Sequence, residues 1–207
     1  MAQLPLAPSL AIKRFLKILW RVGWLSLLVG FCLEVLLQFV TISFGKTPNW
    51  KDFLGSLVQK EVWAFLVCLS LVIVQPQRFA MMLMGLVFAP ISWLSASTLR
   101  QLIKKPLGIA GTSSLAMSTV WVALLRGAEY AVLATLLVML LNRKGRKRDY
   151  LLTGGMIGAA FGAFNLLILN QPAGMGQVVA SSLNEILFPM ACSLVVRTGQ
   201  IAKQREA

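Results

Sequence analysis

The chain has 207 residues, of which 57% are hydrophobic and only 13% are charged, and its mean hydropathy is +0.76. This composition supplies too little polar surface to cover a soluble globule of that size, so it predicts an all-α polytopic membrane protein, a helical bundle. The net charge of +13 comes from short basic clusters between apolar runs. That pattern excludes the basic face of a nucleic-acid-binding protein.

A basic amphipathic helix is expected at the start of the chain, in residues 1–21. Its basic residues recur at helical spacing among large apolar residues, which is typical of a helix that lies flat on the cytoplasmic surface of a membrane. Basic side chains at such a surface also bind anionic lipid headgroups. These residues are Lys13, Arg14, Lys17 and Arg21.

The membrane domain is expected to cover residues 22–196 with six spans, because a span needs about 20 predominantly apolar residues. The second apolar run is short for a crossing unless it begins near Phe53, ahead of Lys60 and Glu61. The third run contains Pro90, which should kink it. The six runs are approximately 22–44, 62–74, 79–96, 108–141, 150–169 and 177–196.

Residues 108–141 form the longest apolar run, which is broken only by Arg126 and Glu129. One long tilted helix is the simpler interpretation. A hairpin turning at Arg126 and Gly127 is the alternative, because each half would be barely long enough to cross. The hairpin becomes necessary if the loop expected at residues 97–107, with its three basic residues, is cytoplasmic. Those basic residues are Arg100, Lys104 and Lys105.

The densest basic cluster lies between the fourth and fifth runs and sets the predicted orientation. Basic loops tend to stay on the cytoplasmic side of a membrane. With six spans, both chain ends, including the basic tail at residues 197–207, are then cytoplasmic in a bacterial-type inner membrane or a thylakoid-like membrane. The cluster is also expected to bind anionic headgroups. It consists of Arg143, Lys144, Arg146, Lys147 and Arg148.

Three glycines recur at every fourth residue of the fifth run, at Gly154, Gly158 and Gly162. Glycine at this spacing leaves a groove along one helix face, so that another backbone can approach closely. Three occupants of this groove are open at this point: another helix of the same chain, a partner subunit and a substrate.

Charged residues inside the apolar runs are the strongest functional signal, because a charge in hydrocarbon costs at least about 2.5 kcal/mol. Arg126 and Glu129 lie three residues apart, so they can neutralise each other on one helix turn. Glu34 and Glu185 have no basic residue within a turn, and each needs a partner from another helix or a protonated carboxyl group. The neutral polar candidates within the spans are Asn165 and Asn184.

The absence of histidine from the sequence excludes most enzyme classes. It rules out a histidine-based metal centre, bis-histidine haem ligation and a Ser-His triad, and no single span carries a pair of carboxylates at helical spacing. Cys32, Cys68 and Cys192 lie far apart in apolar runs, where cysteine packs as a small hydrophobic residue. We therefore expect no catalytic residue, no metal and no cofactor.

Residues 153–162, followed by Asn170, resemble the small-residue span of the PrsW-type glutamic intramembrane protease family. In that family an upstream span carries a Glu-Glu pair and a lysine one turn later, followed by a short basic loop. Here Glu129 alone stands at the paired position, and Val132 stands where the lysine belongs. The resemblance covers the C-terminal half and implies a diverged relative without implying proteolysis. The other departures are Thr153 and Leu169 at acidic positions and the missing late histidine.

These patterns predict a non-catalytic integral membrane subunit, or an assembly protein, of a larger membrane complex. In that role Glu34, Glu129 and Glu185 would fix helix register or meet cations on a partner. The alternative is a small membrane transport subunit with a substrate cavity near Glu34 and Glu185, by analogy in size and topology with six-span importer subunits. The expected partners are membrane lipids and a membrane protein.

Overall fold

A computed structural model of the chain describes residues 8–106, 117–169 and 174–206, which form six long α-helices and contain no strand. Each helix is long and apolar enough to cross a membrane. The predicted all-α polytopic bundle is therefore confirmed, and the chain is an integral membrane protein. The helices are α1 (Pro8–Ser43), α2 (Trp50–Ile73), α3 (Arg78–Lys104), α4 (Met117–Asn142), α5 (Lys147–Leu169) and α6 (Met175–Glu206).

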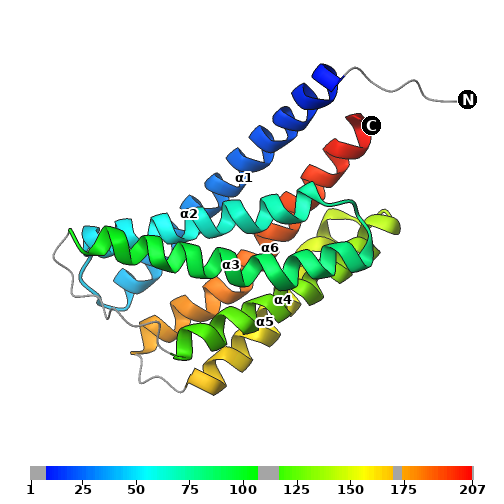
Figure 1. The fold of residues 1–207 in the computed structure, drawn as a ribbon. Helices are drawn as coiled ribbons and strands as arrows, with labels where there is room; N and C mark the ends of the chain where they lie inside the picture. Colours follow the sequence, from blue (N-terminus) through cyan, green and yellow to red (C-terminus); the bar gives the residue numbers. More distant parts are fainter. Residues whose placement is uncertain (1–7, 107–116, 170–173, 207) are drawn as a thin grey trace, which may run out of the picture.

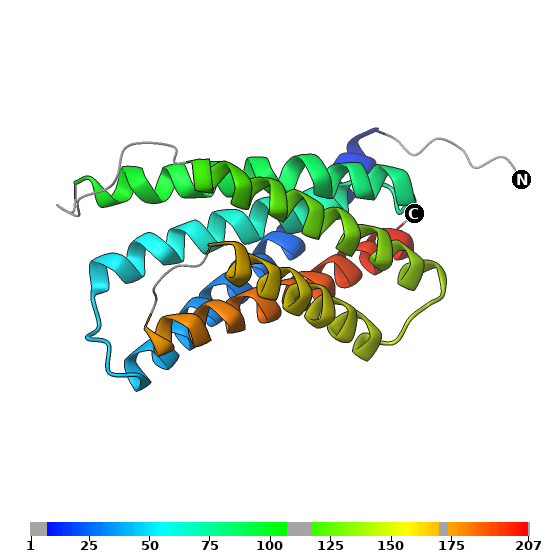
Figure 2. The ribbon, with the colours of Figure 1, turned by 90° about the horizontal axis from the view of Figure 1, so that it is seen from below.

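The helices pack mainly as neighbours in sequence, with α6 closing the bundle against the first two. α3 lies beside α4, and α5 lies beside α6 (Figures 1 and 2). α6 also contacts α1, α2 and α4. The first turns of α1 and the last turns of α6 lie at the same end of the molecule (Figure 1). The core is built around the fully buried side chains of Trp63, Tyr130, Phe188, Leu71 and Leu133.

α1 is one continuous helix from Pro8, which corrects the expectation of a separate surface helix for residues 8–21. Residues 1–7 of that expected helix lie outside the described residues. No proline interrupts it after Pro8, and Val22, at the expected boundary, is buried against α6 beside Gly199. This packing holds the preceding turns in line with the span, which begins at Leu16. Lys13, Lys17 and Arg21 are exposed on these turns, and the side chain of Arg14 lies outside what the structure describes.

α2 and α3 are both longer than their apolar runs. α2 begins at Trp50, so the second run has the length of a full span. α3 continues to Lys104, which corrects the expectation that Arg100 lies in a loop. No glycine or proline interrupts the sequence between Pro90 and Pro106, so the helix has no local reason to end earlier.

α4 continues through Arg126 and Gly127, so the alternative of a hairpin turning there is wrong. The rest of the long run, residues 108–116, lies outside the described residues. The helical hydrogen bonds run through this point because Gly127 sits against α3 instead of forming a turn. A Cβ on Gly127 would lie 2.8 Å from the carbonyl oxygen of Leu86.

α6 also extends further than expected, because residues 197–206 are part of the helix and not a separate tail. Buried Gln200 explains the extension. Its side-chain nitrogen donates to the backbone carbonyls of Leu71 at 3.0 Å and Val74 at 3.1 Å, and Lys203 donates to that of Ile73 at 2.7 Å. The carbonyls at a helix C-terminus lack partners within their own helix. The end of α6 therefore caps α2.

The predicted glycine groove on α5 is filled by α6 of the same chain. A Cβ on Gly154 would lie 2.5 Å from the carbonyl oxygen of Pro189, and one on Gly162 would lie 2.7 Å from the Cβ of Glu185. Gly158 faces the Glu185 carbonyl so closely that any Cβ there would overlap it. Of the three occupants considered for the groove, a partner subunit and a substrate are thereby excluded.

Candidate functional site

Three charged residues of the spans meet in a central cluster, which consists of Arg126, Glu129 and Glu185. Arg126 Nη1 donates to Glu129 Oε2 at 2.6 Å within α4, and Nη2 donates to Glu185 Oε1 of α6. The three side chains are 5%, 0% and 6% exposed. One guanidinium thus faces two carboxylates, so the ionised cluster carries one net negative charge.

Two tryptophan rings also lie close to the guanidinium. The central carbon of Arg126 lies 5.2 Å from the ring centroid of Trp63 and 5.5 Å from that of Trp93. Trp63 in turn stacks on Phe188 at 4.1 Å and meets Tyr130 edge to face at 5.9 Å. Because aromatic faces attract cations, carboxylates and indole rings together hold the guanidinium in place.

Several buried polar atoms in and around the central cluster have no hydrogen-bond partner within the described part of the chain. Buried polar groups are normally paired, and each unpaired one costs about 1–3 kcal/mol. A concentration of such groups at one point in the membrane spans marks the cluster as a candidate functional site. The atoms are Arg126 Nε, Glu129 Oε1, Glu185 Oε2, the Tyr130 hydroxyl and the indole nitrogens of Trp63 and Trp93.

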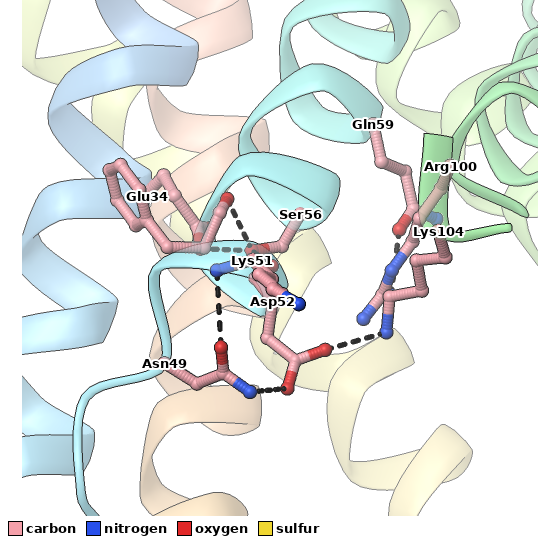
Figure 3. Close-up of polar contacts among 9 residues, drawn as sticks. Glu34, Asn49, Lys51, Asp52, Ser56, Gln59, Arg100 and Lys104 are labelled. Atoms are coloured by element: carbon pink, nitrogen blue, oxygen red, sulfur yellow. Dashed lines mark hydrogen bonds and ion pairs between the residues drawn. The ribbon is translucent and has the colours of Figure 1, made fainter. Parts of the chain in front are cut away.

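Glu34 lies in a different place, which we call the end network, close to the start of α2. It accepts a hydrogen bond from Ser56 of α2 (Figure 3). It also pairs with Lys60 of the same helix. Ser56 lies one turn after Asp52, which is 47% exposed and is bound to Lys104 of α3 at 2.8 Å. Each acid in this network has a base of its own. The end network comprises Glu34, Asp52, Ser56, Gln59, Lys60, Arg100 and Lys104.

A row of paired side chains along the α2–α3 contact joins the end network to the central cluster, and we call it the polar ladder. Its members are four or seven residues apart on each helix, so they share one helix face. The first rung is partly exposed, and the last one contacts Arg126. The rungs are Asp52–Lys104 at 2.8 Å, Gln59–Arg100 at 2.9 Å and Trp63–Trp93 with ring centroids 5.3 Å apart (Figure 3 shows the first two).

The structure brings only part of the predicted set together. Glu185 joins Arg126 and Glu129, whereas Glu34 has its own partners on α2, so no shared cavity forms around Glu34 and Glu185 among the described residues. Asn165 makes no hydrogen bond with the described residues, and the Asn184 side-chain oxygen is buried without a partner in the same set. The five basic residues of the α4–α5 turn and the start of α5 are all exposed: Arg143, Lys144, Arg146, Lys147 and Arg148.

Sequence reasoning missed the residues that complete the site. Trp63, Trp93 and Tyr130 read as ordinary apolar residues of a span. Lys60 reads as part of a loop, although it is the cation that Glu34 requires. Of these residues, only Trp63 could have been found from the sequence. Ser56, Gln59 and Trp63 recur at spacings of three and four, which places them on one face of a helix.

Comparisons with models of protein families, with curated proteins and with solved structures found no match to this chain. The resemblance to the PrsW-type family therefore stays a prediction. Of the two matching residues, Glu129 is bound to Arg126, and Asn170 lies outside the described residues.

Proposed function

We propose that the protein is a membrane transport protein in which the central cluster is a proton-binding site. The observation that carries this proposal is that two carboxylates, Glu129 and Glu185, share the single guanidinium of Arg126 inside the spans. A single proton neutralises the remaining negative charge. Ionisable residues buried in membrane helices characteristically line proton relays and ion pathways.

The polar ladder supports a route to this site. It begins at Asp52, which is partly exposed, continues through Gln59 and Arg100, and ends at the tryptophan pair that contacts Arg126. The rungs offer hydrogen-bonding groups at successive depths along one helix contact. A proton is the ion that best fits this path, because the side chains of the cluster are closely packed and need not separate to admit it.

Reconstitution into liposomes tests the proposal with two readouts. The first is the decay of an imposed pH gradient, followed with an entrapped dye. The second is the infrared carboxyl band that appears when a buried carboxylate takes up a proton. We expect both with the unmutated protein, and expect Glu129→Gln and Glu185→Gln to remove the band and reduce the flux to that of protein-free vesicles.

Asp149→Asn is the matched control, because Asp149 lies in the first turn of α5 and accepts a hydrogen bond from the Arg146 backbone N–H at 2.7 Å, outside the cluster. It should keep both the flux and the band. Folding of every variant is checked by its elution as a single species in detergent. The absence of both signals from the folded, unmutated protein would contradict the proposal.

A role as a non-catalytic subunit of a larger complex is the second candidate. Its support in the sequence was the need of Glu34 and Glu185 for cations from a partner. Lys60 and Arg126 of this chain supply those cations, so that argument no longer favours it. Stoichiometric copurification of another membrane protein in mild detergent, together with no proton flux in liposomes, would favour this role.

For a diverged protease, the deciding result is cleavage of a membrane substrate that Glu129→Gln abolishes.

The orientation is also a proposal. The five basic residues exposed in the α4–α5 turn and at the start of α5 favour a cytoplasmic position for that turn, in a bacterial-type or thylakoid-like membrane. The chain ends would then be cytoplasmic as well. A cysteine introduced at Lys144 of a cysteine-free variant should react with an impermeant maleimide only after the membrane is opened.

A further inference from the structure

Two cysteines that are far apart in sequence touch in the core of the bundle. The Sγ atoms of Cys68 on α2 and Cys192 on α6 lie 3.3 Å apart, and both residues are 1% exposed. The third cysteine, Cys32, is exposed on α1. This contact could not be predicted from spacing, because 124 residues separate the two thiols along the chain.

The contact follows from the packing of α2 on α6. Trp63 and Phe188 stack at 4.1 Å, and each cysteine lies about one turn further along its helix. Gln200 ties α6 to the end of α2 beyond the cysteines. The two helices are therefore held together on both sides of the thiol pair, so the thiols are kept in contact.

We propose that Cys68 and Cys192 form a reversible dithiol–disulfide pair that links α2 to α6 covalently when it is oxidised by a membrane-permeant hydroperoxide. A disulfide has an S–S distance of about 2.0 Å, so the sulfur atoms must approach by only about 1 Å. Neither backbone has to leave its helix for such a displacement. This inference is independent of the proposed transport function.

The oxidation balances with hydrogen peroxide as the oxidant. The sulfur of one cysteine attacks the peroxide, an S–O bond forms and the O–O bond breaks, and the released hydroxide takes the thiol proton to become water. The second sulfur then attacks the sulfenic acid, forming the S–S bond and releasing the oxygen as a second water molecule with the remaining thiol proton. Two thiols are oxidised and one peroxide is reduced to two waters.

The burial of Cys68 and Cys192 determines which oxidants can reach their sulfur atoms. Cys68 and Cys192 are each 1% exposed, so a bulky disulfide such as oxidised glutathione cannot reach either sulfur for exchange. Hydrogen peroxide is close to water in size and polarity and crosses membranes. The pair should therefore respond to hydroperoxide and resist glutathione disulfide, which distinguishes it from an exposed thiol pair.

Counting free thiols in the unmutated, membrane-embedded protein tests the inference. The protein is treated with hydrogen peroxide, denatured, and labelled with a maleimide polymer that shifts the band on a gel. We expect three labels before oxidation and one after it, since the chain has three cysteines. Dithiothreitol should restore three labels, and glutathione disulfide should leave all three in place.

Peptide mapping identifies the bond without any substitution. Trypsin should release a cross-linked species that joins residues 61–78, which contain Cys68, to residues 149–197, which contain Cys192. In Cys68→Ala, oxidation should leave both remaining cysteines labelled, whereas Cys32→Ala should fall from two labels to none. Three labels after oxidation of the unmutated protein, or a cross-link through Cys32, would overturn the inference.

Discussion

The central cluster and the end network use the same residue types in opposite ways. In the end network Glu34 pairs with Lys60, and Asp52 pairs with Lys104. Each acid there has a base of its own, Arg100 adds a third cation, and Lys60 and Asp52 retain 16% and 47% exposure. In the central cluster two acids share one base, and none of the three side chains is more than 6% exposed. The ion pairs of the end network are therefore explained by their contribution to helix packing. The central cluster has one carboxylate more than its single base can neutralise, and helix packing does not explain that extra carboxylate.

Replacing Arg126 with methionine should have the largest effect. It leaves Glu129 and Glu185 buried together without a cation, and breaking a buried ion pair from one side costs about 3–5 kcal/mol. The measurement is the free energy of unfolding in detergent. The loss should shrink as the pH is lowered, because protonation removes both negative charges. Arg100→Met, which removes a cation bound to the neutral Gln59, is the matched control; equal losses in the two variants would erase the distinction between the clusters.

Glu34→Gln should have a smaller effect on the end network, about 1.5–3 kcal/mol, which is the range for a hydrogen bond to a charged group. The Lys60 ammonium remains partly exposed and can turn toward the surface. The same unfolding measurement applies. Adding Lys60→Met should recover part of the loss. A loss as large as that of Arg126→Met would show that the partial exposure of Lys60 does not reduce the cost of removing its partner.

Gly158→Ala tests whether the central cluster depends on the close contact between α5 and α6. A Cβ at Gly158 would overlap the Glu185 carbonyl, so the helices must separate, at a cost of about 1–3 kcal/mol. Gly155→Ala is the control, because its Cβ would meet only the flexible side chain of Met190, 3.2 Å from the sulfur. Equal midpoints of thermal unfolding for the two variants would contradict the packing argument.

Asp52→Asn should have the smallest effect, about 0.2–1 kcal/mol, because the Asp52–Lys104 pair is partly exposed and screened by solvent. High salt should reduce the difference between this variant and the unmutated protein. A larger loss that salt does not change would show that the first rung of the polar ladder is shielded from water.

The sequence predicted the helical architecture well, because apolar runs of sufficient length have few alternatives in a membrane. Helix ends were harder to predict. Lys60 and Glu61 suggested a late start for α2, and Arg100 and Lys104 suggested an early end for α3. These charged residues lie within helices because they contact other helices: Lys60 pairs with Glu34, and Lys104 pairs with Asp52. Hydropathy along one segment carries no information about such partners.

The candidate site was predictable only where its geometry is local. The pairing of Arg126 with Glu129 follows from a spacing of three on one helix, and the structure contains it. The addition of Glu185 depends on how α4 meets α6, 59 residues further along the chain. No spacing rule links those positions. The contact between Cys68 and Cys192 is of the same kind.

Glu185 belongs to two features at once. Its carboxylate binds Arg126, and its backbone carbonyl loses its usual helical donor because Pro189 has no N–H. The carbonyl points instead at Gly158, which has no side chain to obstruct sliding. α6 therefore lacks one helical backbone hydrogen bond at the residue that holds the guanidinium. Bending of α6 at this residue changes the position of the Glu185 carboxylate relative to the Arg126 guanidinium. The flexibility of the helix and the geometry of the ion pair therefore depend on the same residue.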